Sequence, residues 1–220
     1  MSREDKGVSV KKKRRFRITK IIGIILIIAG LGTISYPFFE IYLDKNDISK
    51  NINEWDKQKQ DTKVNSNKNV KDDKKNNNVS KNKYPSVTVD GKDIIGKVIV
   101  KKTGEQIPIL MGATEENLRG GATLYDNGIY PGENGTAIIL GHRETTFGFL
   151  ENIKVGDEVD IESLNNTYKF KVKRTYITTP DDESILAQKN NPSLTLVTCY
   201  PFNYLGHAPE RFIVKLDLIN

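Results

Sequence analysis

The fold of this 220-residue chain is decided near its C-terminus by Leu194-Thr-Leu-Val-Thr-Cys199, followed after eleven residues by Arg211-Phe-Ile-Val-Lys-Leu216. Both are short runs of apolar and β-branched residues, which is typical of strands. Upstream, Thr136–Gly141 (TAIILG) is almost wholly apolar, as expected for a strand that is buried on both faces. Glu158–Ser163 (EVDIES) and Tyr168–Thr178 (YKFKVKRTYIT) alternate instead, so each should have one solvated face.

Further strands precede these runs. Ile94–Lys101 and Gln106–Met111 are expected to form a hairpin around Lys102-Thr103-Gly104. Short helical pieces are expected at Thr114–Arg119 and Phe149–Ile153. Residues 84–220 are enough for one sizeable core. So many strands in one short segment predict a mainly β fold that closes into a barrel, because closure removes exposed strand edges.

An apolar segment lies near the N-terminus. Ile21–Phe39 contains nineteen residues without a charge, which as a helix would span about 28 Å, close to the thickness of a bilayer core. The basic run Lys11–Arg17 precedes it, and positive flanks stay in the cytoplasm. We therefore predict a cytoplasmic tail (1–20) and a transmembrane signal anchor (21–39), with the rest of the chain extracellular. A cleaved signal peptide would end in small residues, whereas this segment ends in Tyr36-Pro37-Phe38-Phe39.

The segment that follows is polar. Residues 44–83 contain ten Asn and eleven Lys, and such a composition buries too little apolar surface to offset the entropy of ordering. We predict a flexible polar linker over residues 40–83, with a coil-like span of about 35 Å. The domains expected from sequence are therefore the tail, the anchor, the linker and a folded domain over residues 84–220.

Charge is unevenly distributed along the chain. The net charge is +7 for residues 1–20 and +4 for residues 44–83, but −4 for residues 84–220. The pI near 9.2 therefore belongs to the tail and the linker. A nucleic-acid-binding domain normally carries its basic patch on the folded part, so nucleic acid is not an expected partner.

Cys199 is the only cysteine of the chain, which excludes an intramolecular disulfide and a multi-cysteine metal cluster. A lone cysteine is often a small buried hydrophobic residue. An unpaired thiol outside the cell calls for another explanation, however, because extracellular proteins tend to pair or lose free cysteines. Cys199 also comes at the end of a strand, just before Tyr200-Pro201. We interpret it as a nucleophile.

Two further side chains complete a candidate catalytic set. His142 follows a buried strand, and an imidazole can manage protons near neutral pH. His207 lies in a Gly- and Pro-containing loop and is the weaker candidate, since rigid strand ends hold reactive groups better. Arg211 begins the last strand. Its guanidinium could be an ordinary solvated charge or could stabilise the oxyanion formed when a thiolate attacks an acyl carbon.

These residues resemble a known family. Thr195-Leu-Val-Thr-Cys199 is similar to the sortase signature TLxTC, Ala137–Arg143 resembles the histidine segment of that family, and Pro209–Val214 resembles its arginine strand. The order His, Cys, Arg agrees as well. The short segment Thr179–Ser193 and the ending around TCYPFN and APERFIV look most like class D sortases.

The resemblance implies an eight-stranded sortase-type β-barrel with His142, Cys199 and Arg211 as catalytic residues, and Thr198 positioning the substrate or the oxyanion. The implied enzyme is a cysteine transpeptidase, with hydrolase and acyltransferase character, at the membrane of a Gram-positive bacterium. It would cleave an LPxTG-type C-terminal sorting signal through a thioester and transfer the protein to an amine of the cell wall. This chemistry requires no metal or organic cofactor.

Two other functions remain open at this point. A membrane-bound cysteine protease would use the same nucleophile with water as the acceptor. A non-enzymatic, tethered wall-binding domain would explain the anchor and the linker without catalysis. Product analysis with a competing amine distinguishes the protease from a transpeptidase. Selective alkylation of Cys199 near neutral pH would count against the non-enzymatic binding domain, because buried structural thiols are inert.

Overall fold

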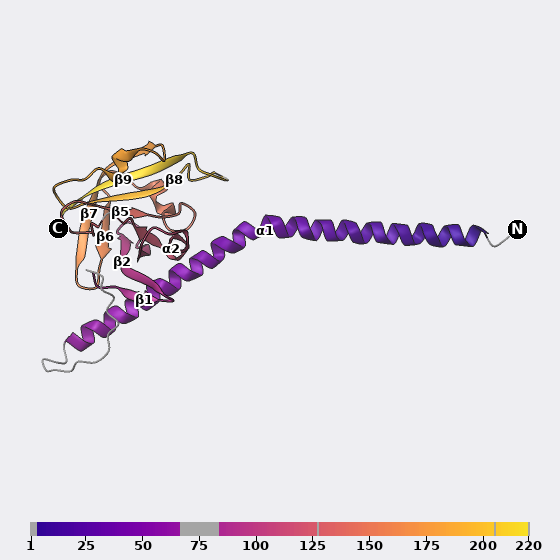
Figure 1. Ribbon diagram of the computed structural model, residues 1–220, viewed down its shortest axis with the longest axis horizontal. Coiled ribbons are helices and arrows are strands. Elements are labelled where there is room, and N and C mark those ends of the chain that lie inside the picture. The colour runs from indigo at the N-terminus through magenta and orange to yellow at the C-terminus, as the bar shows by residue number, and fades with distance from the viewer. Residues whose placement is uncertain (1–3, 67–83, 127, 205, 220) are drawn as a thin grey trace. The chain divides into compact units, whose positions relative to one another are not determined.

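The computed structural model describes residues 4–66, 84–126, 128–204 and 206–219 and divides the chain into two compact units, Met1–Leu43 and Asp44–Asn220. Helix α1 (Glu4–Ser66) begins in the first unit and continues into the second (Figure 1). The large apolar side chains of residues 21–39 are exposed, and α1 is long and apolar enough to cross a membrane by its length and composition. The signal anchor stays a prediction that these properties fit.

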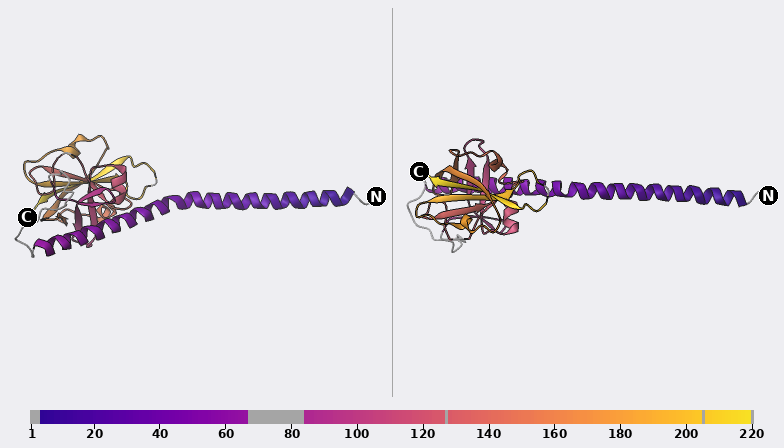
Figure 2. Two further views of the ribbon diagram at one scale, coloured as in Figure 1. Left: turned by 60° about the horizontal axis from the view of Figure 1, so that its bottom comes forward. Right: turned by 90° about the horizontal axis from the view of Figure 1, so that it is seen from above.

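Eight strands of the second unit close into a barrel, as predicted. Figure 2 shows the strands of this unit from two further sides. Around the ring the order is β2, β3, β4, β5, β8, β9, β7 and β6, and β6 pairs back onto β2. A ninth strand, β1, pairs with β2 outside this ring. The strands are β1 (Val87–Val89), β2 (Lys92–Val100), β3 (Gln106–Met111), β4 (Ala122–Leu124), β5 (Thr136–Leu140), β6 (Glu158–Glu162), β7 (Thr167–Thr178), β8 (Ser193–Tyr200) and β9 (Glu210–Leu218).

The strand pattern of the sequence accounts for the core. On β7 the buried residues Phe170 and Val172 alternate with exposed lysines, so one face packs inside the barrel and the other faces solvent. Strand β5 is buried along most of its length, as its apolar run predicts. Most neighbouring strands are antiparallel, but β3 and β4 are parallel, and so are β5 and β8. The carboxyl ends of β5 and β8 therefore lie at the same rim of the barrel.

Three short helical segments join the strands: α2 (Glu115–Gly120) and the 3-10 turns η1 (Gly148–Asn152) and η2 (Glu183–Leu186). Helix α2 begins after Thr114, whose hydroxyl accepts a hydrogen bond of 3.2 Å from the Asn117 amide, a common N-cap. The helical pieces expected near α2 and η1 are present. The sequence did not indicate β1, β4 or η2, because three or four residues are too few to show a period.

The predicted linker is corrected by the structure over residues 44–66. These residues are helical, and Trp55 is fully buried in a cluster with Val87, Val89, Ile94 and Leu110 of the barrel wall. Residues 67–83 of the predicted linker lie outside the described residues. The composition of the segment is polar on average, but Ile48, Asn51 and Trp55 recur at helical spacing and lie on one face, and all three are buried.

Polar contacts attach this helical segment to the barrel as well. The Asn51 side-chain amide donates to the Gly120 carbonyl over 2.8 Å. Glu162 of β6 accepts a hydrogen bond of 3.2 Å from the Trp55 indole and forms an ion pair of 3.0 Å with Lys59. The ammonium of buried Lys97 lies between Glu162 and Asp56. The helix thus covers an outer face of the barrel through one aromatic anchor and paired charges.

Candidate active site

Three strand ends bring the predicted catalytic residues together at one rim of the barrel. Leu140 of β5 pairs with Val197 of β8 in parallel register, and the Gly141 amide donates to the Val197 carbonyl over 3.1 Å. His142 therefore follows beside Cys199. On the other side of β8, Cys199 pairs directly with Arg211 of β9.

The strand period also places these side chains on one face. Leu140, Val197 and Ile213 belong to an apolar cluster on the outer side of the barrel. His142 and Cys199 lie two residues after Leu140 and Val197, and Arg211 lies two residues before Ile213 on the antiparallel strand β9. Side chains two residues apart share a face of a strand. Register and period together predict one outward-facing site.

Cys199 is partly exposed and carries a free thiol. Its neighbour Thr198 is buried on the opposite face, where its hydroxyl donates to the Gly141 carbonyl over 2.7 Å. This hydrogen bond ties the end of β8 to the end of β5. Thr198 thus fixes the spacing of the two reactive segments, and its role toward substrate or oxyanion stays a prediction.

The loop that carries His142 folds back on itself. The His142 carbonyl accepts hydrogen bonds from the amides of Thr146 (3.1 Å) and Phe147 (2.8 Å). A Cβ atom on Gly141 would lie 2.7 Å from the Phe147 ring, so only glycine fits where the strand turns into this loop. The imidazole Nε2 lies 3.8 Å from a carboxylate oxygen of Glu115.

Arg143 is a structural residue of the site that sequence reasoning missed. Its side chain is 4% exposed and pairs with Glu144 over 2.6 Å. The guanidinium donates to the carbonyls of Pro201 (2.8 Å), Tyr204 (2.8 Å) and Gly206 (3.1 Å). It therefore joins the loop after His142 to the loop after Cys199. No spacing in the sequence could have indicated this, because the acceptors are backbone carbonyls about sixty residues away.

Arg211 lies in the predicted place but turns toward its own loop. One guanidinium nitrogen, Nη1, donates to the carbonyls of Glu210 (2.9 Å) and Ala208 (3.3 Å). Its oxyanion role stays a prediction. His207 is exposed in the same loop, and the structure gives it no place among the strand ends that carry the other three residues.

An apolar floor extends away from Cys199 along the outer face of β5, β8 and β9. Its buried members are Ile138, Val197 and Ile213, together with Ile185 of η2. Tyr125, Leu140 and Tyr176 pack against them. The segment between β7 and β8 thus contributes one apolar side chain to the covering of this floor, whose buried members are at most 8% exposed.

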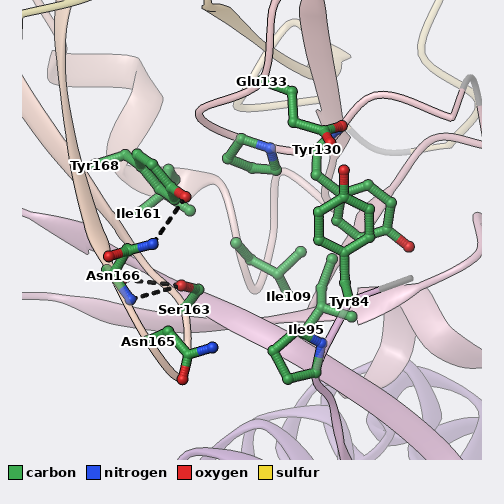
Figure 3. A pocket seen from close by; sticks show the side chains of 12 residues that line it. Tyr84, Ile95, Ile109, Tyr130, Glu133, Ile161, Ser163, Asn165, Asn166 and Tyr168 are labelled. Carbon is green, nitrogen blue, oxygen red and sulfur yellow. Dashed lines mark hydrogen bonds between the residues drawn. The ribbon is translucent and has the colours of Figure 1, made fainter. Parts of the chain in front are cut away.

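A pocket of about 200 Å³ lies elsewhere, at the opposite rim of the barrel (Figure 3). Three tyrosines and the Asn165–Asn166 turn line it around a floor of isoleucines. None of the predicted catalytic residues lines it. Its lining includes Tyr130, Pro131 and Glu133, which lie just before β5, whereas His142 lies just after β5. Among the described residues no group of three or more His, Cys, Asp and Glu is arranged to hold a metal ion.

Comparisons with known proteins agree with this geometry. A family model described as Sortase domain matches residues 98–219. Sortase D of Bacillus subtilis is 33% identical over 120 residues, which are 54% of this chain and 61% of that protein. Sortase A of Bacillus anthracis is 25% identical over 92% of this chain and 95% of its own length. The structure of a Clostridium perfringens Sortase D5 transpeptidase covers 81% of this chain and 99% of its own, with a TM-score of 0.57 and 24% identity.

The closed eight-stranded barrel, with Cys199, His142 and Arg211 at one rim, defines the class of protein by its fold. The chain belongs to the sortase family. The predicted resemblance to sortases, most like class D, is confirmed by these matches. Sortases are membrane-anchored cysteine transpeptidases that attach surface proteins to the cell wall. The match to Sortase D spans 61% of that relative's length.

Proposed function

We propose that this chain is a membrane-anchored cysteine transpeptidase that cleaves an LPxTG-type sorting signal and transfers the surface protein to an amine of the cell wall. The observation that carries the proposal is the pairing register, in which Cys199 lies opposite Arg211 and beside the end of β5 that bears His142. Helix α1 supplies an apolar segment for the anchor. With its basic flank in the cytoplasm, the barrel is extracellular.

In the first half-reaction the Cys199 sulfur attacks the carbonyl carbon of the signal's threonine. The negative charge that develops on the carbonyl oxygen is stabilised by Arg211. The carbon–nitrogen bond then breaks, and His142 gives a proton to the departing amine. The product is a thioester between Cys199 and the surface protein.

In the second half-reaction the amine of a peptidoglycan precursor attacks the thioester carbon. The carbon–sulfur bond breaks, the amine loses a proton to His142, and the thiol is restored. We ascribe contact with the leucine and proline of an LPxTG-type signal to the partly buried Tyr125, Leu140 and Tyr176 at the edge of the apolar floor. Specificity for this signal is thus ascribed to the outer face beside Cys199.

The test uses the full chain in detergent micelles, an LPxTG-type peptide and a short amine acceptor. Mass spectrometry should detect a peptide–amine product, and in the absence of the amine a thioester adduct on Cys199. Cys199→Ala should reduce product formation to background. Transfer that persists in Cys199→Ala would refute the proposal, and acid as the dominant product at saturating amine would favour a protease instead.

A further inference from the structure

A second pocket, of about 390 Å³, lies behind the segment between β7 and β8 on the outer face of β7, β8 and β9. Four basic side chains line it: Lys173, Arg174, Lys189 and Lys215. Lys215 pairs in register with Arg174 on one side and with Thr195 on the other. The pocket therefore lies four residues along β8 from Cys199, or about 13 Å.

The positive charge of this pocket is only partly balanced. Lys189 forms an ion pair with Asp217, with 2.6 Å between Nζ and Oδ1. The Lys215 ammonium donates to the neutral Ile185 carbonyl over 2.9 Å. Within the described part of the chain, neither Arg174 nor Lys215 forms an ion pair with a carboxylate. The Arg174 guanidinium lies over the Tyr176 ring, 4.6 Å from its centroid. An anion in the pocket would therefore meet two cations, Arg174 and Lys215, whose charges no carboxylate of the described residues balances by an ion pair.

The ionisation of Lys215 shows the effect of this imbalance. Burial, together with the charges of Lys189 and Arg174, lowers the pKa of Lys215 to about 8, and Asp182 opposes the shift. Like charges and burial both disfavour a protonated amine, whereas a nearby negative charge favours it. A bound anion would therefore remove part of the repulsion between these side chains.

One buried polar group points to the same pocket independently. Thr195 lines the pocket and is fully buried, and among the residues that the structure describes its hydroxyl has no hydrogen-bond partner. Buried hydroxyls in folded proteins nearly always have one. The hydroxyl of Ser193, also in the pocket wall, is already bonded to Thr136 and Gly135. Thr195 is thus a donor whose acceptor is still to be supplied.

We propose that this pocket binds a phosphate-type oxyanion. A guanidinium, ammonium groups and a hydroxyl donor match the several acceptor oxygens and the charge of a phosphoryl group better than those of a single carboxylate. Lys189 belongs to the β7–β8 segment and Arg174 to the barrel, so the anion bridges the two. Since Ile185 of that segment covers the apolar floor, the bound anion fixes the cover beside Cys199.

Isothermal titration calorimetry of the full chain in detergent micelles tests the proposal. Inorganic phosphate should bind, and sodium chloride at the same ionic strength should not. The double variant Arg174→Gln/Lys215→Met should weaken binding by about 10- to 100-fold. The matched control Lys171→Gln changes a lysine of β7 outside the pocket and should leave the affinity unchanged. Affinity in the unmodified chain should fall as the pH rises through 8, where Lys215 loses its proton.

A second variant separates a built site from diffuse attraction. Thr195→Val keeps the shape of the side chain, removes the hydroxyl and should weaken phosphate binding by about 2- to 10-fold. Hydrogen exchange of residues 183–189 should slow in phosphate for the unmodified chain and not for the double variant. Absence of binding at 10 mM phosphate, or affinities that neither variant changes, would overturn the proposal. An unchanged affinity in Thr195→Val alone would reduce it to nonspecific charge attraction.

The source of the phosphoryl group is tested in the same format. Poly(glycerol phosphate) represents a wall polymer, and phosphatidylglycerol mixed into the micelles represents a lipid headgroup. A tighter affinity for one of them than for inorganic phosphate identifies the source. Equal affinities identify the free anion. None of these measurements depends on transpeptidation, so the site and the proposed enzyme can fail separately.

Discussion

Two outer faces of the barrel are each covered by an added segment, and the two covers differ in what they leave unsatisfied. Over β1, β2 and β6, helix α1 buries Trp55 completely and pairs its lysine with Glu162. Over β5, β8 and β9, the β7–β8 segment contributes Ile185 to the apolar floor, and a pocket with unpaired cations lies behind it. The first cover makes paired polar contacts, and the second lies beside Cys199 and the basic pocket.

The difference teaches how one barrel separates stability from function. Burying a large aromatic side chain stabilises the fold, and its paired charges are satisfied locally. On the other face, Arg174 and Lys215 form no ion pair with a carboxylate among the described residues, and the buried Thr195 hydroxyl has no hydrogen-bond partner among them. Substitutions on the helix side should therefore change stability and spare the rate, whereas substitutions at the strand ends should change the rate and spare stability.

The largest effect is expected from the imidazole at the strand end. His142→Ala should lower kcat for peptide transfer by about 10²- to 10⁴-fold, because the general acid and base is lost. Thermal unfolding should change little, since the side chain is partly exposed. His207→Ala is the matched control, and it should leave kcat within about twofold of the unmodified chain. A larger loss in His207→Ala would exchange the assigned roles of the two histidines.

The next effect belongs to the opposite face. Trp55→Ala should lower the free energy of unfolding by about 3–5 kcal/mol, because it empties a buried site and leaves Glu162 without one of its donors. Denaturant titration of the full chain in micelles measures this loss. Lys57→Ala changes an exposed residue of the same helix and should stay within about 0.5 kcal/mol. If Trp55→Ala reduced kcat well below the melting temperature, the two faces would not be independent.

Substitution of Arg143 should affect both stability and rate, because its side chain contacts both loops of the candidate site. Arg143→Met should destabilise the chain by about 1–3 kcal/mol because loop carbonyls lose their donor. It should also lower kcat, by up to about 10²-fold, as the strand-end loops shift. Arg143→Lys should recover part of the stability without the rate, because an ammonium cannot reproduce the guanidinium fork. Equal recovery of both would indicate a purely structural role, and Arg119→Met is the control at an exposed arginine of α2.

The smallest expected effect is a fall in the free energy of unfolding at acid pH, caused by Glu162 on the face that helix α1 covers. Burial by itself raises the pKa of Glu162. Hydrogen bonds from Lys59 and Trp55 and the charge of Lys97 outweigh this effect, so the pKa of Glu162 lies below its ordinary value. The carboxylate therefore contributes stability above about pH 4.5 that is lost as the pH falls through its folded pKa. Glu162→Gln should flatten the fall in unfolding free energy below pH 4.5. Glu158→Gln, at a more exposed pair, should not flatten it.

The sequence predicted the strands well because each long strand carries its own period. Alternation on β7 and the apolar run of β5 are local signals, and both strands lie where those signals placed them. Strand β4 has three residues and shows no period. The helical segment 44–66 was predicted as a linker because the prediction used the average composition of the segment, which is polar. The few apolar residues at helical spacing around Trp55 were present in the sequence, but the average hides them.

The candidate site was predicted as a set of residue types at strand ends, and its arrangement was not. Motif order indicated His142, Cys199 and Arg211, but only the strand register shows which of them are neighbours. Contacts made through backbone carbonyls, such as those of Arg143, leave no trace in residue spacing. The basic pocket has the same origin, because its lysines come from β7, β9 and a loop.

The parallel pairing of β5 with β8 has a consequence for the order in which the protein becomes competent. The three candidate residues lie at positions 142, 199 and 211. Strands β8 and β9 follow each other with a short loop between them, but β5 meets β8 only after the long connection from Leu140 to Ser193 has closed. Closing such a connection costs entropy before any contact repays it, so the β5–β8 pairing is expected late in folding. The β2–β3 hairpin, with partners close in sequence, can form early. His142 should therefore come to lie beside Cys199 only in the last stage of folding, and a partly folded chain should not yet hold the candidate site.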